Sequence, residues 1–246
     1  MTASSAPSQA NERLAAVQAR LEAAARQSGR ALSDVKLLAV SKIQPIEKIR
    51  ALYAAGQRAF GENYVREATG KMDALAGSLG KERARALEWH LIGPLQSNKT
   101  RPVAERFDWV HTVESEKVAR RLSEQRPAGM VPLNVLIQVN VSGEASKSGI
   151  SPAEVAGLVA VIAPLSGLKL RGLMAIPEPT ADTGLQRSRF SEVKRLMEKL
   201  RFQGFELDTL SMGMSDDIEA AIAEGATMVR VGTAIFGARH KVRTAA

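Results

Sequence analysis

The feature of this sequence that most restricts its fold is a regular alternation of short apolar segments with longer amphipathic ones. Eight short segments have the length and composition of buried strands: residues 35–40, 57–60, 87–92, 109–112, 133–141, 168–176, 207–210 and 227–231. Helical spacing marks residues 11–27, 45–55, 64–79, 96–105, 115–125, 152–163, 185–202 and 216–223, and a last helix begins at Thr233. Strands that alternate with helices pair in parallel, so eight such units predict an α/β fold, a single (β/α)8 TIM-type barrel with an extra N-terminal helix. A doubly wound open sheet is the alternative.

The length and the start of the chain indicate one domain. With 246 residues and no internal linker, the chain has the size of a single barrel, and we expect one domain over residues 1–246 with residues 1–9 disordered. The first ten residues lack the basic and apolar regions of a signal peptide, and no segment approaches the ~20 apolar residues of a membrane helix. The absence of cysteine fits a reducing compartment. We therefore expect a cytoplasmic protein with no membrane contact.

The charge of the chain raises the question of an anionic partner. The formal net charge is +8, which is compatible with nucleic acid or with a small anionic ligand. Most basic residues, however, alternate with acidic ones on helices, and only residues 238–243 are locally basic, without an aromatic residue for base stacking. We therefore expect no nucleic-acid partner.

Polar residues stand where the predicted strands end, which is where barrel proteins place their chemistry. Lys42 follows the first strand and Asn63 the second, whereas His90 lies within the third and Arg230 within the eighth. A lysine amine at a barrel mouth is partly desolvated, which favours its neutral, nucleophilic form. Such an amine forms a Schiff base with an aldehyde or ketone. The carbonyl belongs either to a substrate, as in aldolases, or to pyridoxal 5′-phosphate (PLP).

The last third of the sequence favours PLP, because it contains two candidate phosphate-binding turns. Ser211 and Gly213 stand in the turn after the seventh strand, and Gly232 and Thr233 stand between the eighth strand and its helix. Glycine lets the backbone approach an anion, and barrels often bind phosphate in these two loops. Arg230 is a permanent cation, so a pyridine nitrogen that faces it stays unprotonated and makes a weaker electron sink.

Eight motifs, in order, resemble those of the pyridoxal phosphate homeostasis protein family, which is similar to the N-terminal barrel domain of alanine racemases. They are AVSKIQP (39–45), FGENYVRE (60–67), WHLIGPLQSNK (89–99), HTVES (111–115), IQVNVSGEASKSG (137–149), GLMAIP (172–177), LSMGMSDD (210–217) and VRVGTAIFG (229–237). The resemblance implies a Schiff base between PLP and Lys42, and a pyridine nitrogen that faces Arg230. It also implies a phosphate held by Ser211, Gly232 and Thr233, and a pocket lined by Asn63, His90 and Met174.

The function that this resemblance implies is PLP homeostasis, meaning storage or delivery of the cofactor, without catalysis or a metal. The expected partners are PLP and, transiently, PLP-requiring apoenzymes, and the expected state is a monomer. A PLP-dependent amino-acid racemase is the main alternative. A cofactor-free aldolase and a nucleic-acid binder are the others. Lys147 is either a second amine that captures PLP or a solvated loop lysine.

Overall fold

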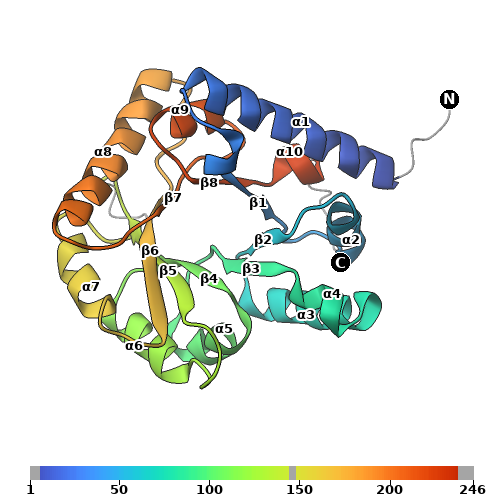
Figure 1. Ribbon diagram of the computed structural model, residues 1–246, viewed down its shortest axis with the longest axis horizontal. Helices are drawn as coiled ribbons and strands as arrows, with labels where there is room; N and C mark the ends of the chain where they lie inside the picture. The colour runs from blue at the N-terminus through green and yellow to red at the C-terminus, as the bar shows by residue number, and fades with distance from the viewer. Residues whose placement is uncertain (1–5, 144–147, 238–246) are drawn as a thin grey trace, which may run out of the picture.

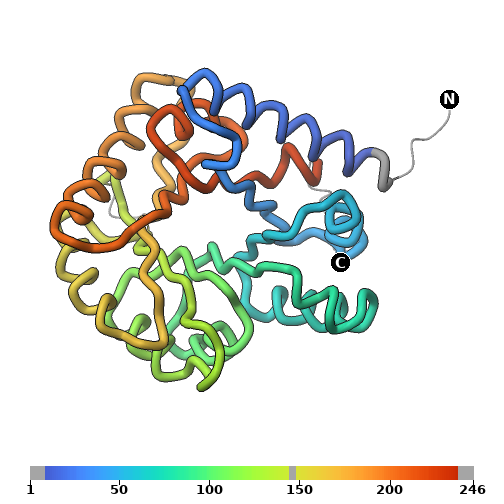
Figure 2. Tube along the Cα trace, in the orientation of Figure 1, coloured from blue at the N-terminus to red at the C-terminus, as the bar shows by residue number. Residues whose placement is uncertain are grey.

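The computed structural model describes residues 6–143 and 148–237, and its centre is a closed barrel of eight parallel strands. Each strand pairs with the next along the chain, and the last pairs with the first (Figures 1 and 2). The strands are β1 (Lys36–Val40), β2 (Ala59–Glu62), β3 (Glu88–Leu91), β4 (Trp109–Val113), β5 (Leu133–Val139), β6 (Leu168–Ala175), β7 (Thr209–Ser211) and β8 (Met228–Val231). The predicted (β/α)8 barrel is confirmed.

Helices connect the strands and surround the barrel (Figure 1). They are α1 (Ala6–Gln27), α2 (Ile46–Ala54), α3 (Val65–Leu79), α4 (Lys81–Arg85), α5 (Thr100–Arg106), α6 (Glu116–Gln125), α7 (Val155–Ile162), α8 (Thr183–Phe202), α9 (Ile218–Ala223) and α10 (Thr233–Phe236), with 3₁₀ turns η1 (Leu32–Asp34) and η2 (Ser97–Lys99). None of the helices in the described part of the chain is both long and apolar enough to cross a membrane. The disorder expected over residues 1–9 stays a prediction for residues 1–5, which lie outside the described residues, whereas α1 begins at Ala6.

The extra N-terminal helix α1 packs across α2, α9 and α10 (Figure 1). Its apolar residues Leu14, Val17 and Leu21 are buried at the spacing of one helix face. This packing brings α1 beside the segments that follow β7 and β8, so Arg20 of α1 reaches the backbone of Ser215.

Two helical segments differ from the sequence prediction. The helix predicted over 64–79 is followed by the separate short helix α4, because Gly80 has a φ of +84° and breaks the first helix. None of the α4 residues is buried, so this helix has no apolar periodicity from which it could be predicted. The helix predicted over 96–105 is divided into the turn η2 and the helix α5.

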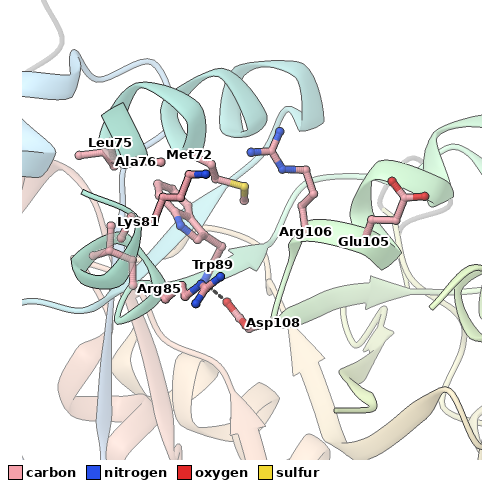
Figure 3. Close-up of a pocket in the computed structure, with 11 residues that line it drawn as sticks. Met72, Leu75, Ala76, Lys81, Arg85, Trp89, Glu105, Arg106 and Asp108 are labelled. Carbon is pink, nitrogen blue, oxygen red and sulfur yellow. Dashed lines mark hydrogen bonds between the residues drawn. The ribbon is translucent and has the colours of Figure 1, made fainter. Parts of the chain in front are cut away.

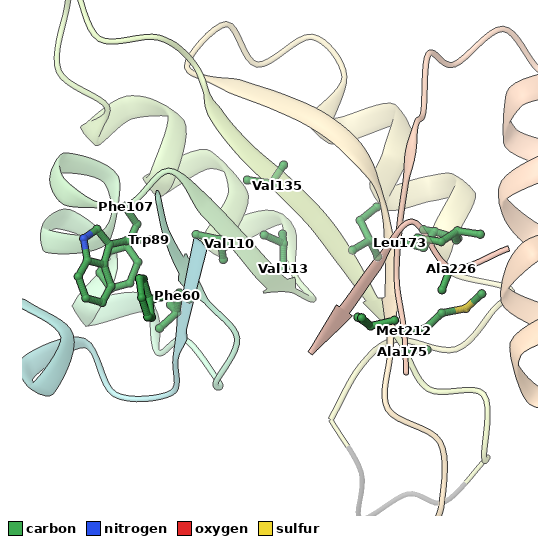
Figure 4. Close-up of a cluster of buried hydrophobic side chains, with 14 of the residues drawn as sticks. Phe60, Trp89, Phe107, Val110, Val113, Val135, Leu173, Ala175, Met212 and Ala226 are labelled. Atoms are coloured by element: carbon green, nitrogen blue, oxygen red, sulfur yellow. The ribbon is translucent and has the colours of Figure 1, made fainter. Parts of the chain in front are cut away.

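The main apolar core lies between the barrel and its helices. Figure 4 shows part of it, with Phe60, Trp89 and Phe107 on one side of the barrel and Leu173 and Met212 on the other. The barrel interior is different, because the residues that the structure describes there form two small apolar clusters. They are Leu38, Ala59 and Met228, and Trp109, Leu136 and Met174. Buried polar side chains from β3, β4, β7 and β8 occupy the same interior: His90, His111, Ser211 and Arg230.

Candidate functional site

A cavity of about 580 Å³ opens at the carboxyl ends of the strands. Its residues come from the ends of β1, β2, β3, β6, β7 and β8 and from α1: Val40, Lys42, Asn63, Ile92, Ile176, Met214, Ser215, Asp216, Arg230, Gly232, Thr233, Ala234 and Arg20. This end of a barrel is where active and binding sites are found, and the volume is in the range of pockets for small ligands. The cavity is therefore the candidate site.

Lys42 and Asn63 enter the cavity from neighbouring strand ends. Lys42 lies two residues after β1 and also lines a small hollow with Gln44 and Gly237. Asn63 directly follows β2, and its Oδ1 is buried without a hydrogen-bond partner in the described part of the chain. The backbone of Asn63 packs closely on Gly93, where a Cβ atom would lie 2.3 Å from the Asn63 carbonyl oxygen. This close approach holds Asn63 in place and leaves a buried acceptor for a ligand.

The loops after β7 and β8 form a further part of the cavity wall, and the loop after β8 lies beside the end of β1. Gly213 has a φ of +93°, and this conformation turns the chain so that Ser215 lines the cavity. The backbone carbonyl of Ser215 accepts a hydrogen bond of 2.6 Å from Nη1 of Arg20. Two further nitrogens of Arg20 donate to both carboxylate oxygens of Glu219, at 2.5 and 2.6 Å. The N-terminal helix therefore fastens the loop that contains Ser215.

Arg230 forms the floor of the cavity and is held there by backbone and side-chain acceptors. Its Nη1 donates to the carbonyl and hydroxyl oxygens of Ser211, at 2.6 and 2.7 Å, and its Nη2 donates to the carbonyl of Ala175 at 2.9 Å. Burial lowers the pKa of Arg230 to about 10, which still leaves the guanidinium charged at neutral pH. Arg230 is thus a fixed cation and a permanent donor.

Two buried histidines lie below Arg230 in the barrel interior. Nδ1 of His111 lies 3.0 Å from the hydroxyl of Ser211, and Nε2 of His111 lies 2.9 Å from Nδ1 of His90. Nε2 of His90 lies 3.0 Å from Oε1 of Glu88, although these two atoms are not aligned for a good hydrogen bond. Burial lowers the pKa of His90 to about 4 and holds the pKa of His111 well below its usual range. Both rings are therefore neutral at pH 7.

The structure brings five of the eight predicted site residues to the cavity: Lys42, Asn63, Arg230, Gly232 and Thr233. The other three, His90, Met174 and Ser211, are fully buried inside the barrel and do not line it. Their side chains point into the interior at strand positions below the mouth. Lys147 and the basic segment 238–243 lie outside the described residues.

Eight of the thirteen cavity residues are not among the predicted site residues, and two of these, Ser215 and Arg20, bear most on the proposed phosphate site. Ser215 belongs to the same SMGMS segment as Ser211, and the sequence shows two serines there without showing which one faces the site. Arg20 belongs to a helix of ordinary amphipathic pattern, and its partners are 195 and 199 residues away. No local signal in the sequence identifies such a contact.

A second pocket, of about 450 Å³, lies on the outer surface of the barrel (Figure 3). Met72 and Leu75 of α3, Lys81 and Arg85 of α4, and Trp89 are among its lining residues. It shares no residue with the first cavity, and Lys42 is not among its lining residues. We therefore assign the chemistry to the barrel mouth.

The closed barrel with a lysine after β1 and an arginine in β8 defines a class of domain. The family model described as the N-terminal domain of alanine racemase matches residues 13–240 of this chain. The predicted similarity to that domain is confirmed.

Comparison with individual proteins narrows the class. A pyridoxal phosphate homeostasis protein of Pseudomonas aeruginosa is 56% identical over 93% of this chain and 95% of its own length, and one of Vibrio cholerae is 55% identical over 93% and 96%. The PipY protein of Synechococcus elongatus, whose structure was solved with PLP bound, is 37% identical, with a TM-score of 0.81 over 93% of this chain and all of its own. This chain belongs to the pyridoxal phosphate homeostasis protein family.

Proposed function

We propose that this protein binds PLP in the cavity at the barrel mouth, through a Schiff base on Lys42, and stores or delivers the cofactor. The observation that carries the proposal is the convergence of Lys42, Arg230 and the Gly232–Thr233 turn on one cavity. The names of its relatives, and the PLP in the Synechococcus structure, support the same ligand.

The residues of the cavity fit the chemical groups of PLP. Lys42 supplies a primary amine for the aldehyde, and the buried charge of Arg230 supplies a donor for the pyridine nitrogen. The phosphate fits the backbone of Gly232 and Thr233 together with Ser215, with Arg20 nearby as a second cation. The unpartnered Oδ1 of Asn63 is an acceptor for a polar group of the ring.

The lining of the cavity favours a different serine for the phosphate than the one that the sequence predicted. Ser211 was expected to hold the phosphate, but its hydroxyl is buried and bonded to Arg230 and His111. Ser215 lines the cavity beside Gly232 and Thr233. We therefore assign the phosphate contact to Ser215 and a supporting role under Arg230 to Ser211.

The chemistry that PLP supplies when bound is an aldehyde that condenses with an amine, with loss of water, and a ring that withdraws electrons. Arg230 limits the second property, because a guanidinium donates a hydrogen bond and does not release its proton. A ring nitrogen that accepted from Arg230 would stay unprotonated, and the ring would withdraw electrons less strongly. The cavity therefore favours holding the cofactor over catalysis with it.

The proposed role includes transient partners. The protein acts as a cytoplasmic monomer and passes PLP to apoenzymes that require it. Recovery of activity in an apoenzyme supplied with the loaded protein, while a phosphatase destroys free PLP, tests this transfer. Loss of recovery when the phosphatase is present shows that release into solution is the only route, and this result contradicts direct delivery.

The experiment that tests PLP binding is a titration of the protein with PLP, followed by visible absorption. Wild-type protein should develop a yellow Schiff-base band, whereas Lys42→Ala should not. Lys194→Ala is a matched control, since Lys194 lies on the exposed face of α8 beside Glu198. A band of equal intensity in Lys42→Ala and wild type contradicts the proposal.

A further inference from the structure

A buried ion cluster, which the proposed function does not use, lies next to Lys42. Nζ of Lys71, in α3, donates to the carboxylates of Glu62 and Glu67 at 2.7 and 2.5 Å, and to the backbone carbonyl of Ser41 at 2.7 Å. An ammonium group has three protons, so these three bonds use all of them. Lys71 is only 8% exposed and Glu62 is fully buried. Such a cluster fixes its atoms, because moving Lys71 away from Glu62 leaves buried charges without partners.

The cluster holds the chain on both sides of Lys42. On the preceding side, the Ser41 carbonyl accepts from Lys71, and the Ser41 hydroxyl donates to Oε1 of Glu62 at 2.6 Å. On the following side, the backbone N–H of Ile43 donates to Oε1 of Glu67 at 2.6 Å. Lys42 is the one residue between these two anchored peptide groups.

The anchored segment is a tight turn in an unfavourable conformation. The N–H of Gln44 donates to the carbonyl of Ser41 at 3.0 Å, so residues 41–44 close a four-residue turn with Lys42 at its second position. Ile43 occupies the third position with a φ of +60°, and it is the only residue other than glycine with a positive φ in the described part of the chain. A β-branched side chain disfavours this conformation, and glycine is the usual residue there. The side chain of Ile43 is 59% exposed, so core packing does not impose the turn.

We propose that Lys71, Glu62 and Glu67 are positioning residues that hold the turn around Lys42 and thereby direct its amine into the cavity. The bond from Ile43 to Glu67 offsets the unfavourable φ, and the bond from Lys71 to Ser41 fixes the start of the turn. This inference rests on the proposed function, since it concerns the geometry of the PLP lysine. It assigns to three residues outside the cavity a role in orienting Lys42.

The test uses Glu67→Ala and two ligands that differ only at the reacting group. Glu67 is the safest member to remove, because it is partly exposed and Lys71 keeps its bond to Glu62. PLP forms the bond to Lys42, whereas pyridoxine 5′-phosphate has an alcohol in place of the aldehyde and cannot form it. We expect the dissociation constant of PLP to rise at least about tenfold, as for the loss of a charge-assisted hydrogen bond, and that of pyridoxine 5′-phosphate to change less than about twofold.

A rescue variant distinguishes a loss of the turn around Lys42 from a general distortion of the fold. In Glu67→Ala, Ile43 is free to leave its positive φ, whereas glycine adopts that φ without strain. Adding Ile43→Gly to Glu67→Ala should therefore return PLP affinity to within about fivefold of wild type, the remainder reflecting the greater freedom of glycine. Ile43→Pro disrupts the same turn directly, because proline lacks the N–H that donates to Glu67 and cannot adopt a positive φ. It should show the same difference between the two ligands, and it serves as the test if Glu67→Ala does not fold.

Glu116→Ala is the matched control. It breaks the ion pair between Glu116 and Arg120 on α6, whose partners are four residues apart, as are Glu67 and Lys71. It should leave both affinities unchanged. Equal weakening of both ligands in Glu67→Ala would mean a distorted cavity and overturn the inference, as would no weakening of either. Wild-type protein that binds PLP no more tightly than pyridoxine 5′-phosphate would instead overturn the proposed function, and the inference with it.

Discussion

The hydroxyl oxygen of Ser211 accepts a hydrogen bond from Nη1 of Arg230 at 2.7 Å. Because arginine only donates, the hydroxyl proton of Ser211 is left for Nδ1 of His111, 3.0 Å away. His111 then donates from Nε2 to Nδ1 of His90, and the second nitrogen of His90 points toward Glu88. With both rings neutral, one direction of donation satisfies the series from Arg230 as far as Nδ1 of His90. The hydroxyl of Ser211, a residue predicted to bind phosphate, is therefore bonded to Arg230 and His111 in this structure.

Ser211→Ala should destabilise the fold and leave PLP binding nearly unchanged. The substitution leaves Nδ1 of His111 without its partner, and such a loss lowers the free energy of unfolding by about 1–3 kcal/mol. Arg230 keeps its bonds to the backbone carbonyls of residues 175 and 211, so PLP affinity should change less than about threefold. Urea unfolding and a PLP titration check the two parts. A large loss of affinity with unchanged stability would return Ser211 to the phosphate site.

Ser215→Ala combined with Thr233→Val should weaken PLP binding by about a hundredfold or more. Each lost bond to a charged phosphate is worth roughly 1.5–3 kcal/mol. Pyridoxal, which lacks the phosphate, is the control ligand, and its affinity should be the same for the variant and for wild type. If both ligands weaken equally, the phosphate does not lie at these residues.

The two buried histidines should make the fold less stable as the pH falls from 7 to 5. Burial lowers the folded-state pKa of His90 to about 4 and that of His111 well below its usual range, so the unfolded chain binds more protons in this interval. The stability that they contribute is present above about pH 6.5 and is lost as the pH falls toward 4. Each histidine should lower the free energy of unfolding by about 2 kcal/mol between pH 7 and pH 5.

Denaturant unfolding at several pH values measures this effect. Burial raises the pKa of Glu62 and of Asp217, and these carboxyls act in the opposite sense at the acidic end. His111→Gln isolates the histidine contribution, because the variant should lose roughly half of the pH dependence. An unchanged slope in this variant would mean that His111 does not titrate in the interval.

The protein loaded with PLP should not racemise amino acids. Racemisation needs an acid or base on each face of the α-carbon. Among the described cavity residues, the candidates for such an acid or base are Lys42 and Asp216. Asp216 lies beside Ser215, on the side proposed for the phosphate. The two tyrosines of the chain lie elsewhere, Tyr53 against Arg58 and Tyr64 largely exposed at the start of α3. Exchange of the α-proton of alanine in heavy water should be negligible, and exchange at ~1 per second or faster would favour the racemase alternative.

The fold and part of the site follow from the sequence, because they depend on local patterns. Apolar alternation and helical spacing predict every barrel strand, and the place of Lys42 after β1 follows from the strand ending there. Gly232 and Thr233 are found in the same way, from a glycine followed by a threonine where a strand passes into a helix.

The remaining site residues depend on distant contacts that no local pattern records. Which serine of the SMGMS segment faces the cavity is decided by the turn at Gly213 and by Arg20, a residue of the first helix. The positive φ of Ile43 runs against local preference, and the groups that hold the turn there include Glu67, 24 residues further along the chain. The family resemblance predicts that His90 lines the pocket, whereas in the structure its ring lies 2.9 Å from that of His111 in the barrel interior.

The measurement that tests the central claim most directly is the location of PLP after borohydride reduction. Reduction turns the Schiff base into a stable secondary amine, and peptide mass spectrometry then identifies the modified lysine. We predict one pyridoxyl phosphate group per chain, on the peptide that contains Lys42, and no such group in Lys42→Ala. A reduced adduct spread over exposed lysines, or one found equally in Lys42→Ala, would contradict the account.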